Sequence, residues 1–170
     1  MSFTSHEWWG LIHGMGFGAL FLLAFAGGLA GLYSLRPGLL TPAGLAERLR
    51  RLKVGVVTMA VAAWGTVLTG TWVVYPWYRE KTPDSPRSKL LANPDTEQWH
   101  TFGMEWKEHV AWLAPILATA VAFIVVYYGA QLVRHERVRR TALGLYVLAF
   151  AFAAVAGAFG AFITKVAPVL

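Results

Sequence analysis

The chain contains no cysteine, and this absence excludes several classes of site at once. Without thiols it cannot form disulfides, cysteine-ligated iron–sulfur clusters, thiolate zinc sites or covalently attached c-type haem. The sequence also lacks a nucleophile elbow, a phosphate-binding loop and a zinc signature. Any metal in this protein must therefore be bound by His, Asp, Glu, Met or Tyr.

Polar residues are also scarce. The chain has 170 residues, is 56% hydrophobic and has a mean hydropathy of +0.49, which leaves too little polar surface for a soluble globule of this size. Its apolar stretches each approach the ~20 residues that cross about 30 Å of hydrocarbon. They cover residues 8–33, 54–78, 109–133 and 141–164.

These stretches predict an all-α integral membrane protein that forms a four-transmembrane-helix bundle in one domain, residues 1–170. The expected helices cover about residues 5–33, 42–78, 94–134 and 141–165, with an outer loop at 79–93. No Lys or Arg precedes the first apolar stretch, so we expect it to remain as the first helix and not to be cleaved as a signal peptide.

The basic residues are concentrated in two loops. The segment between the first two helices carries five basic residues against Glu47, and the segment between the last two carries four against Glu136. The positive-inside rule places both loops in the cytoplasm, so both termini and the 79–93 connection are expected to be extracytoplasmic. The net charge of +6 then indicates membrane topology and attraction to anionic lipid at the cytoplasmic loops, and no nucleic-acid partner. We predict a multi-pass protein of the bacterial cytoplasmic (inner) membrane.

Caps and prolines mark the expected helix boundaries. The pattern Thr4-Ser5-His6-Glu7 predicts a capping box, and Thr41-Pro42 and Asn93-Pro94 each offer an N-cap with a first-turn proline. Pro76 is expected to disrupt the end of the second helix, and Pro115 to bend the third by freeing the Ala111 carbonyl.

Small residues recur every four positions along the first and last helices. Such stripes favour close helix packing in membranes. An alternative is that the glycines beside His13 make room for a flat macrocycle. The stripes are Gly10, Gly14 and Gly18, then Gly27 and Gly31, Ala153 and Gly157, and Ala156 and Gly160.

His13 and His109 are the candidate cofactor-binding residues. They are expected at comparable depth on the first and third helices, on the extracytoplasmic side. A bis-histidine b-type haem requires two such rings, one for each face of the porphyrin, so the two would ligate the haem iron of at most one haem. The alternative is a structural histidine pair. We expect His100 to be interfacial and His135 to be a solvated loop residue.

The same region suggests a second arrangement. His6, Glu7, Glu105 and Glu108 can join the two histidines in a polar relay or a non-haem metal site. The alternative is a salt-bridged interfacial network that includes Lys107 and Lys165. A transmembrane ion pathway is disfavoured, because no acid or base is expected in the inner half of any helix.

Residues 100–112, HTFGMEWKEHVAW, look like a stretch of uncharacterised bacterial four-helix membrane proteins. The architecture resembles small four-helix b-type cytochrome and membrane-anchor subunits of respiratory complexes. This resemblance implies a membrane subunit of a respiratory or photosynthetic electron-transfer complex, with one b-type haem or a quinone near the outer face. The alternative is a cofactor-free accessory subunit that packs against larger membrane proteins. Either function makes the chain a component of a larger membrane complex and not an enzyme by itself.

Overall fold

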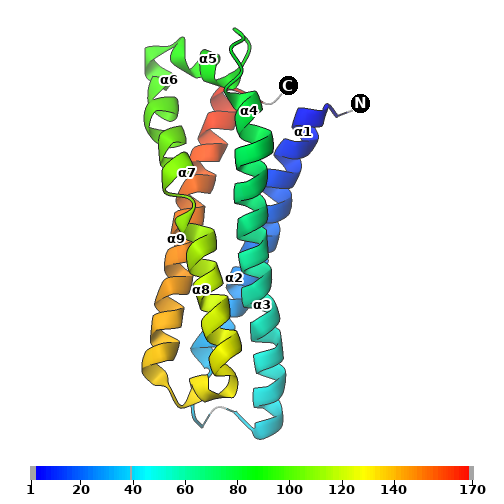
Figure 1. Cartoon of the computed structure of the whole chain (residues 1–170), viewed down its shortest axis with the longest axis vertical. Coiled ribbons are helices and arrows are strands. Elements are labelled where there is room, and N and C mark those ends of the chain that lie inside the picture. The colour runs from blue at the N-terminus through cyan, green and yellow to red at the C-terminus, as the bar shows by residue number, and fades with distance from the viewer. Residues whose placement is uncertain (1–2, 39, 169–170) are drawn as a thin grey trace.

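The computed structural model describes residues 3–38 and 40–168, and within these ranges the chain is helical without any strand. Four helices are long and apolar enough to cross a membrane, and they lie side by side as an up-and-down bundle (Figure 1). They run Ser5–Ser34, Pro42–Tyr78, Pro94–Val133 and Glu136–Val166, and are called the first to fourth long helices below. The prediction of an all-helical chain with four such helices is confirmed.

Three of the long helices consist of several segments, whereas the fourth is the single helix α9 (Glu136–Val166). The first contains α1 (Ser5–Gly10), a π-helical segment (Leu11–Gly16) and α2 (Phe17–Ser34). The second contains α3 (Pro42–Thr69), a π-helical segment (Gly70–Val74) and α4 (Tyr75–Tyr78). The third contains α6 (Pro94–Gln98), a π-helical segment (Trp99–Met104), α7 (Glu105–His109), α8 (Leu113–Tyr128) and a 3₁₀ segment (Gly129–Val133).

The predicted caps are present. Thr4 Oγ1 accepts a hydrogen bond from the Glu7 amide at 3.2 Å, and the Glu7 carboxylate accepts one from the Thr4 amide at 2.6 Å, which completes the capping box. The Thr41 side chain accepts from the Gly44 amide, with Pro42 in the first turn. Asn93 similarly accepts from the Asp95 amide and precedes Pro94. These three helix starts were therefore specified by local sequence.

Other boundaries differ from the expectations. The 79–93 connection, expected to be a loop, contains the short helix α5 (Pro86–Leu91), which Ser85 caps. The fourth long helix begins at Glu136 and not at 141, because a helix can continue into polar residues that hydropathy leaves out. Glu136 and Arg140 lie one turn apart there and form an ion pair of 2.6 Å.

The third long helix breaks near Pro115, as expected, but the Ala111 carbonyl is not left free. It accepts a hydrogen bond from the Ala114 amide at 3.1 Å, so a short turn replaces the bond that proline cannot make. The second long helix continues through Pro76 to Tyr78, with a π-helical segment directly before this last turn.

The main core contains apolar residues from all four long helices, among them Leu32, Val56, Val125 and Tyr146. A smaller cluster lies at the end that carries both chain termini, called the terminal end below (Figure 1). There Leu90 of α5 is fully buried with Tyr78, Met104 and Ile163, so the 79–93 connection is packed onto the bundle.

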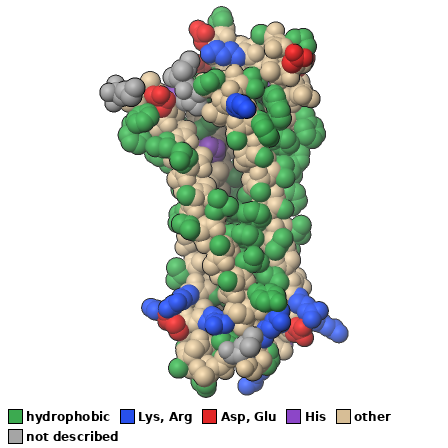
Figure 2. All heavy atoms as spheres, turned by 180° about the vertical axis from the view of Figure 1, so that it is seen from behind, with side chains coloured by type: hydrophobic (Ala, Val, Ile, Leu, Met, Phe, Trp, Pro, Cys, Tyr) green, Lys and Arg blue, Asp and Glu red, His purple; other side chains and the backbone are tan. Residues whose placement is uncertain are grey.

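The charges separate along the bundle axis. The opposite end, called the basic end below, carries the connections 35–41 and 134–135. Figure 2 shows Lys and Arg gathered around the basic end, mixed charges at the terminal end, and hydrophobic side chains between them. Both termini lie at the terminal end (Figure 1).

Candidate functional site at the terminal end

The three π-helical segments all lie in the halves of their helices nearer the terminal end (Figure 1). Each π turn inserts a residue into the α-helical pattern, and such turns are rare and frequently lie at functional sites. His13 lies in the first segment, Gly70 begins the second, and His100 lies in the third. Because Gly70 packs against His13, the first two segments meet at one point.

His13 is half-buried between the first and second long helices, and its Nδ1 lies 3.1 Å from Thr69 Oγ1. The Thr69 hydroxyl donates to the Gly65 carbonyl at 2.7 Å, so its oxygen accepts the proton of His13 Nδ1. In a neutral imidazole this arrangement assigns the hydrogen to Nδ1 and leaves the lone pair on Nε2. His13 can then accept a proton from a ligand, and when charged it can donate one.

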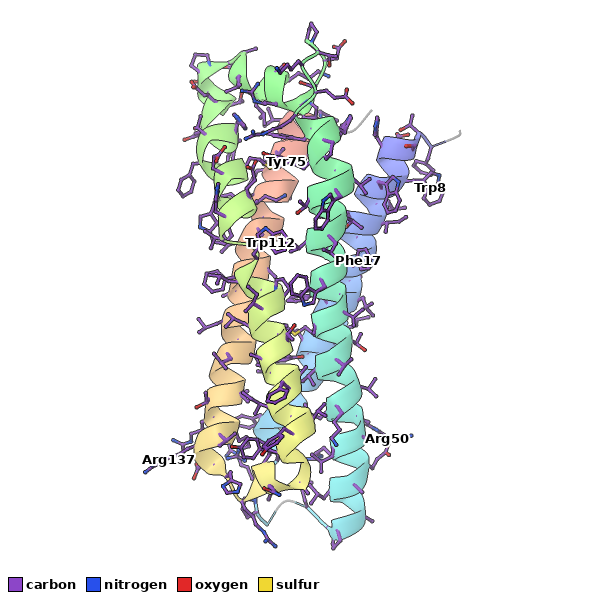
Figure 3. The ribbon with its side chains drawn as sticks, viewed as in Figure 1. Trp8, Phe17, Arg50, Tyr75, Trp112 and Arg137 are labelled. Atoms are coloured by element: carbon purple, nitrogen blue, oxygen red, sulfur yellow. The ribbon has the colours of Figure 1, made fainter. Side chains whose placement is uncertain are left out.

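Glycines on the second long helix make room for these rings. A Cβ at position 70 would lie 2.8 Å from His13 Cε1, and a Cβ at 65 would lie 2.5 Å from Phe17 Cε1. Phe17 therefore packs one helical turn further along the bundle axis than His13, toward the basic end. Figure 3 shows Phe17 near the level of Trp112. The two glycines therefore leave space for the His13 imidazole and for the Phe17 ring.

Lys107 is the second polar group inside this part of the bundle. Its side chain lies over Gly160 of α9, where an added Cβ would be 2.9 Å from Nζ. Among the described residues its ammonium has no ion-pair or hydrogen-bond partner. A cation in apolar surroundings favours a ligand oxygen that can accept its protons.

The acids of this region are paired elsewhere. Arg79 Nη2 lies 3.2 Å from Glu105 Oε1 and 3.5 Å from Glu108 Oε1, and the Tyr75 hydroxyl donates to Glu108 Oε2 at 2.8 Å. The expected interfacial network therefore forms around Arg79, and Lys107 takes no part in it. Lys165 is exposed near the end of α9.

The expected relay is divided among separate contacts. Glu7 belongs to the capping box, and the His6 ring stacks on Trp77 with ring centres 5.3 Å apart. Neither side chain forms a hydrogen bond to Glu105 or Glu108 within the described ranges. The described part of the chain also has no group of three or more His, Asp or Glu side chains arranged to hold a metal ion.

His109 does not share the surroundings of His13. Its side chain is 73% exposed, and its Nδ1 donates to the Glu105 carbonyl of its own helix at 2.8 Å. A bis-histidine haem needs both rings to face one macrocycle. Because one ring packs on Gly70 and the other lies on the bundle surface, the residues present do not fit the expected pair of haem ligands.

His100, expected to be interfacial, is buried. The Tyr78 hydroxyl lies 2.8 Å from its Nδ1, and Arg87 Nε donates to its Nε2 at 3.3 Å. The histidine thus joins the second long helix, the third long helix and α5. His100 therefore has a structural role, because both of its ring nitrogens already have hydrogen-bond partners in the chain.

The first long helix leaves this region open on one side. It packs against α9 mainly through α2, so its terminal half lies apart from the fourth long helix (Figure 1). An added Cβ would meet nothing within 4 Å at Gly14, Gly18 or Gly157. Figure 2 shows a hollow on this face near the terminal end, with a histidine side chain inside it. Among the stripe glycines, close packing is found at Gly31, where an added Cβ would lie 3.0 Å from Leu52, and at Gly160, where it would lie 2.9 Å from Lys107.

No protein-family model, curated protein or solved structure matches this chain. The functional argument therefore rests on the geometry of this site. Sequence patterns did not assign Thr69 or Gly70 to this site. Lys107 was predicted to belong to an interfacial ion-pair network, although an intramembrane lysine beside two acids can also indicate a ligand site.

Proposed function

We propose that the chain is a multi-pass membrane protein of the bacterial cytoplasmic membrane, with its basic end in the cytosol and both termini outside. The support is the excess of Arg and Lys in the connections at the basic end, combined with four helices long and apolar enough to cross a bilayer. An alkaline phosphatase fused after residue 170 is expected to be active, and the same enzyme inserted at residue 135 inactive. The reverse pattern would contradict this orientation.

Within that membrane we propose that His13 and Lys107 bind the head group of a quinone, as part of an electron-transfer complex. A quinone head is a flat apolar ring with two carbonyl oxygens, so it requires proton donors in an otherwise apolar site. Lys107 supplies an ammonium without a described protein partner. Thr69 holds His13 Nδ1, and His13 Nε2 has no hydrogen-bond partner among the described residues. The Lys107 ammonium, which has no described protein partner and lies at the same end of the bundle as His13, is the observation that carries this proposal.

The two residues suit different steps of quinone chemistry. The lysine stabilises negative charge on a carbonyl oxygen, whereas neutral His13 accepts a proton from a quinol hydroxyl at Nε2. Electrons would pass to or from a redox centre of a partner subunit. The chain then acts as a quinone-facing subunit and not as a complete enzyme.

The test is quinone binding by the whole chain in lipid nanodiscs, followed by quenching of tryptophan fluorescence with menaquinone and ubiquinone. We expect His13→Ala and Lys107→Met each to weaken binding at least tenfold. Matched controls are His109→Ala and Lys165→Met, which remove the same side-chain types at the same end and should change affinity less than twofold. Equal losses in the controls, or no quinone binding by the unsubstituted chain, would overturn the proposal.

An absorption spectrum of the same preparation tests the haem alternative. Because the His109 side chain is exposed and bonds to its own helix, we expect no Soret band that depends on both histidines. A Soret band that disappears in both His13→Ala and His109→Ala would instead favour haem.

A cofactor-free assembly subunit is the second candidate, and a different observation favours it. Gly14 and Gly18 of the first long helix and Gly157 of the fourth have open space where a side chain would be. Small residues at open positions allow a transmembrane helix of another protein to approach closely. Leucine at positions 14 and 18 should then release a partner subunit from a chain that binds no quinone. If these glycines instead border the quinone site, the same substitutions should weaken quinone binding.

A further inference from the structure

A pocket of about 660 Å³ lies at the basic end, far from the site described above. It is formed by the end of α2, the residues that follow it, and the beginning of α9. Its polar wall contains Arg36, Arg134, Arg139 and Arg140 together with one acid, Glu136. The wall therefore carries an excess of positive charge.

The arginines are held in different ways. Arg139 is buried and donates to the Leu35 carbonyl, so its guanidinium is fixed in the wall. Arg36 lies over the Tyr33 ring, with its Cζ 4.2 Å from the ring centre. Arg140 pairs with Glu136 at 2.6 Å, whereas Arg134 forms no ion pair within the described residues. Arg36 Nε also donates to the Tyr33 carbonyl at 3.1 Å, which leaves its terminal nitrogens without a described partner. Arg134 and the terminal nitrogens of Arg36 thus remain available to an anionic ligand.

The rest of the wall is apolar and comes from Leu32, Tyr33, Val133 and Leu143. All four lie at the cytosolic ends of helices in the proposed orientation, where headgroups give way to hydrocarbon. An arginine cluster beside an apolar wall suits a ligand that has a phosphate at one end and an alkyl chain at the other. An inorganic phosphate ion would leave the apolar wall uncovered.

We infer that this pocket binds the phosphate group of an anionic phospholipid from the cytosolic leaflet, with an acyl chain along the Tyr33 and Leu143 side. Guanidinium groups bind phosphate through paired hydrogen bonds, and arginine is preferred over lysine where this geometry matters. The inference rests on the membrane orientation proposed above and is independent of quinone binding.

A second groove, beside the first long helix, is less suited to binding a phosphate group. It has a volume of about 260 Å³ and contains Arg48 and Arg51. Arg51 pairs with Glu47 at 2.6 Å, and Arg48 donates to the Ser34 carbonyl at 3.4 Å. Both cations of this groove have oxygen partners, whereas the larger pocket contains Arg134, which has none among the described residues, and is therefore the better phosphate site.

The experiment is native mass spectrometry of the whole chain in detergent, with phosphatidylglycerol and phosphatidylcholine as competing probes. We expect one phosphatidylglycerol to be retained in preference to phosphatidylcholine. Each basic residue near an anionic lipid contributes about a fivefold change in affinity, so Arg134→Gln should weaken binding about fivefold and Arg36→Gln with Arg134→Gln about 25-fold. Arg137→Gln is the matched control, because Arg137 is exposed in the same turn and outside the pocket, and it should stay within twofold.

Three results would overturn the inference: equal retention of phosphatidylcholine, an equal loss in Arg137→Gln, or complete displacement of the lipid by millimolar inorganic phosphate. The last result would identify a site for free phosphate. Arg134→Gln removes no described hydrogen bond or ion pair, so it is expected to keep the fold, and circular dichroism checks this. Loss of lipid preference with intact quinone binding overturns this inference alone, whereas loss of quinone binding with intact lipid preference overturns only the quinone site.

Discussion

The Tyr146 hydroxyl of α9 donates a hydrogen bond to the Ala24 carbonyl of α2 at 2.8 Å, across the centre of the bundle. The tyrosine reaches this carbonyl only because position 28 has no side chain, since an added Cβ there would overlap the phenol. The contact fixes the distance between the first and fourth long helices. Above this point the two helices separate, which leaves the region around His13 open (Figure 1).

Gly28→Ala should therefore destabilise the protein by about 1–3 kcal/mol, the usual range for overpacking a close-packed interior. Gly27→Ala is the control, because its Cβ would meet nothing within 4 Å. Thermal unfolding in detergent measures both. An equal effect at the two adjacent positions would show that helix propensity, and not the tyrosine contact, decides the result.

Thr69→Val should weaken quinone binding. The substitution keeps the shape of the side chain but removes the oxygen that accepts the His13 Nδ1 proton. Loss of one such hydrogen bond corresponds to about 1 kcal/mol, or roughly fivefold in affinity. Thr66→Val is the control, since the Thr66 hydroxyl donates to the Ala62 carbonyl of its own helix. Fluorescence titration in nanodiscs measures both variants, and unchanged affinity in Thr69→Val would argue against a role for His13 orientation.

Lys107→Met should make the empty protein more stable while removing its ligand. An ammonium within a membrane-spanning helix destabilises the inserted state by about 2–3 kcal/mol. Replacing it with an apolar side chain of similar length removes that penalty. Lys165→Met, at an exposed position, should shift stability by less than about 0.5 kcal/mol. If Lys107→Met unfolds at a lower temperature than the unsubstituted chain, Lys107 has a structural partner and the ligand argument fails.

His100→Ala should release the 79–93 connection from the bundle. The substitution removes the partner of both Tyr78 and Arg87, which join α5 to the second and third long helices. Limited proteolysis is expected to cut near residues 82–86 several times faster, with quinone affinity unchanged. His6→Ala is the control, because that ring only stacks on Trp77. Equal cleavage in both variants would contradict a bracing role for His100.

Sequence patterns predicted much of the fold, because long apolar stretches and local caps are properties of neighbouring residues. The capping box at Thr4 and Glu7 and the proline at position 42 needed no information from other helices. The start of the fourth long helix was placed too late, because hydropathy detects the apolar segment and not the full helix. The helix α5 was missed since its stability depends on burying Leu90 against distant residues.

The sequence by itself determined that this protein is helical, that four helices can cross a membrane, and that its basic residues gather in two connections. These features depend on the hydropathy and charge of consecutive residues and need no contact between helices. Only the tertiary structure decided which polar groups meet. The rotation of each helix about its axis turned His109 outward and brought His13 to Thr69 and Gly70, and this rotation is set by side-chain packing between helices. Residues at equal depth in separate helices share a site only when that packing directs them toward each other.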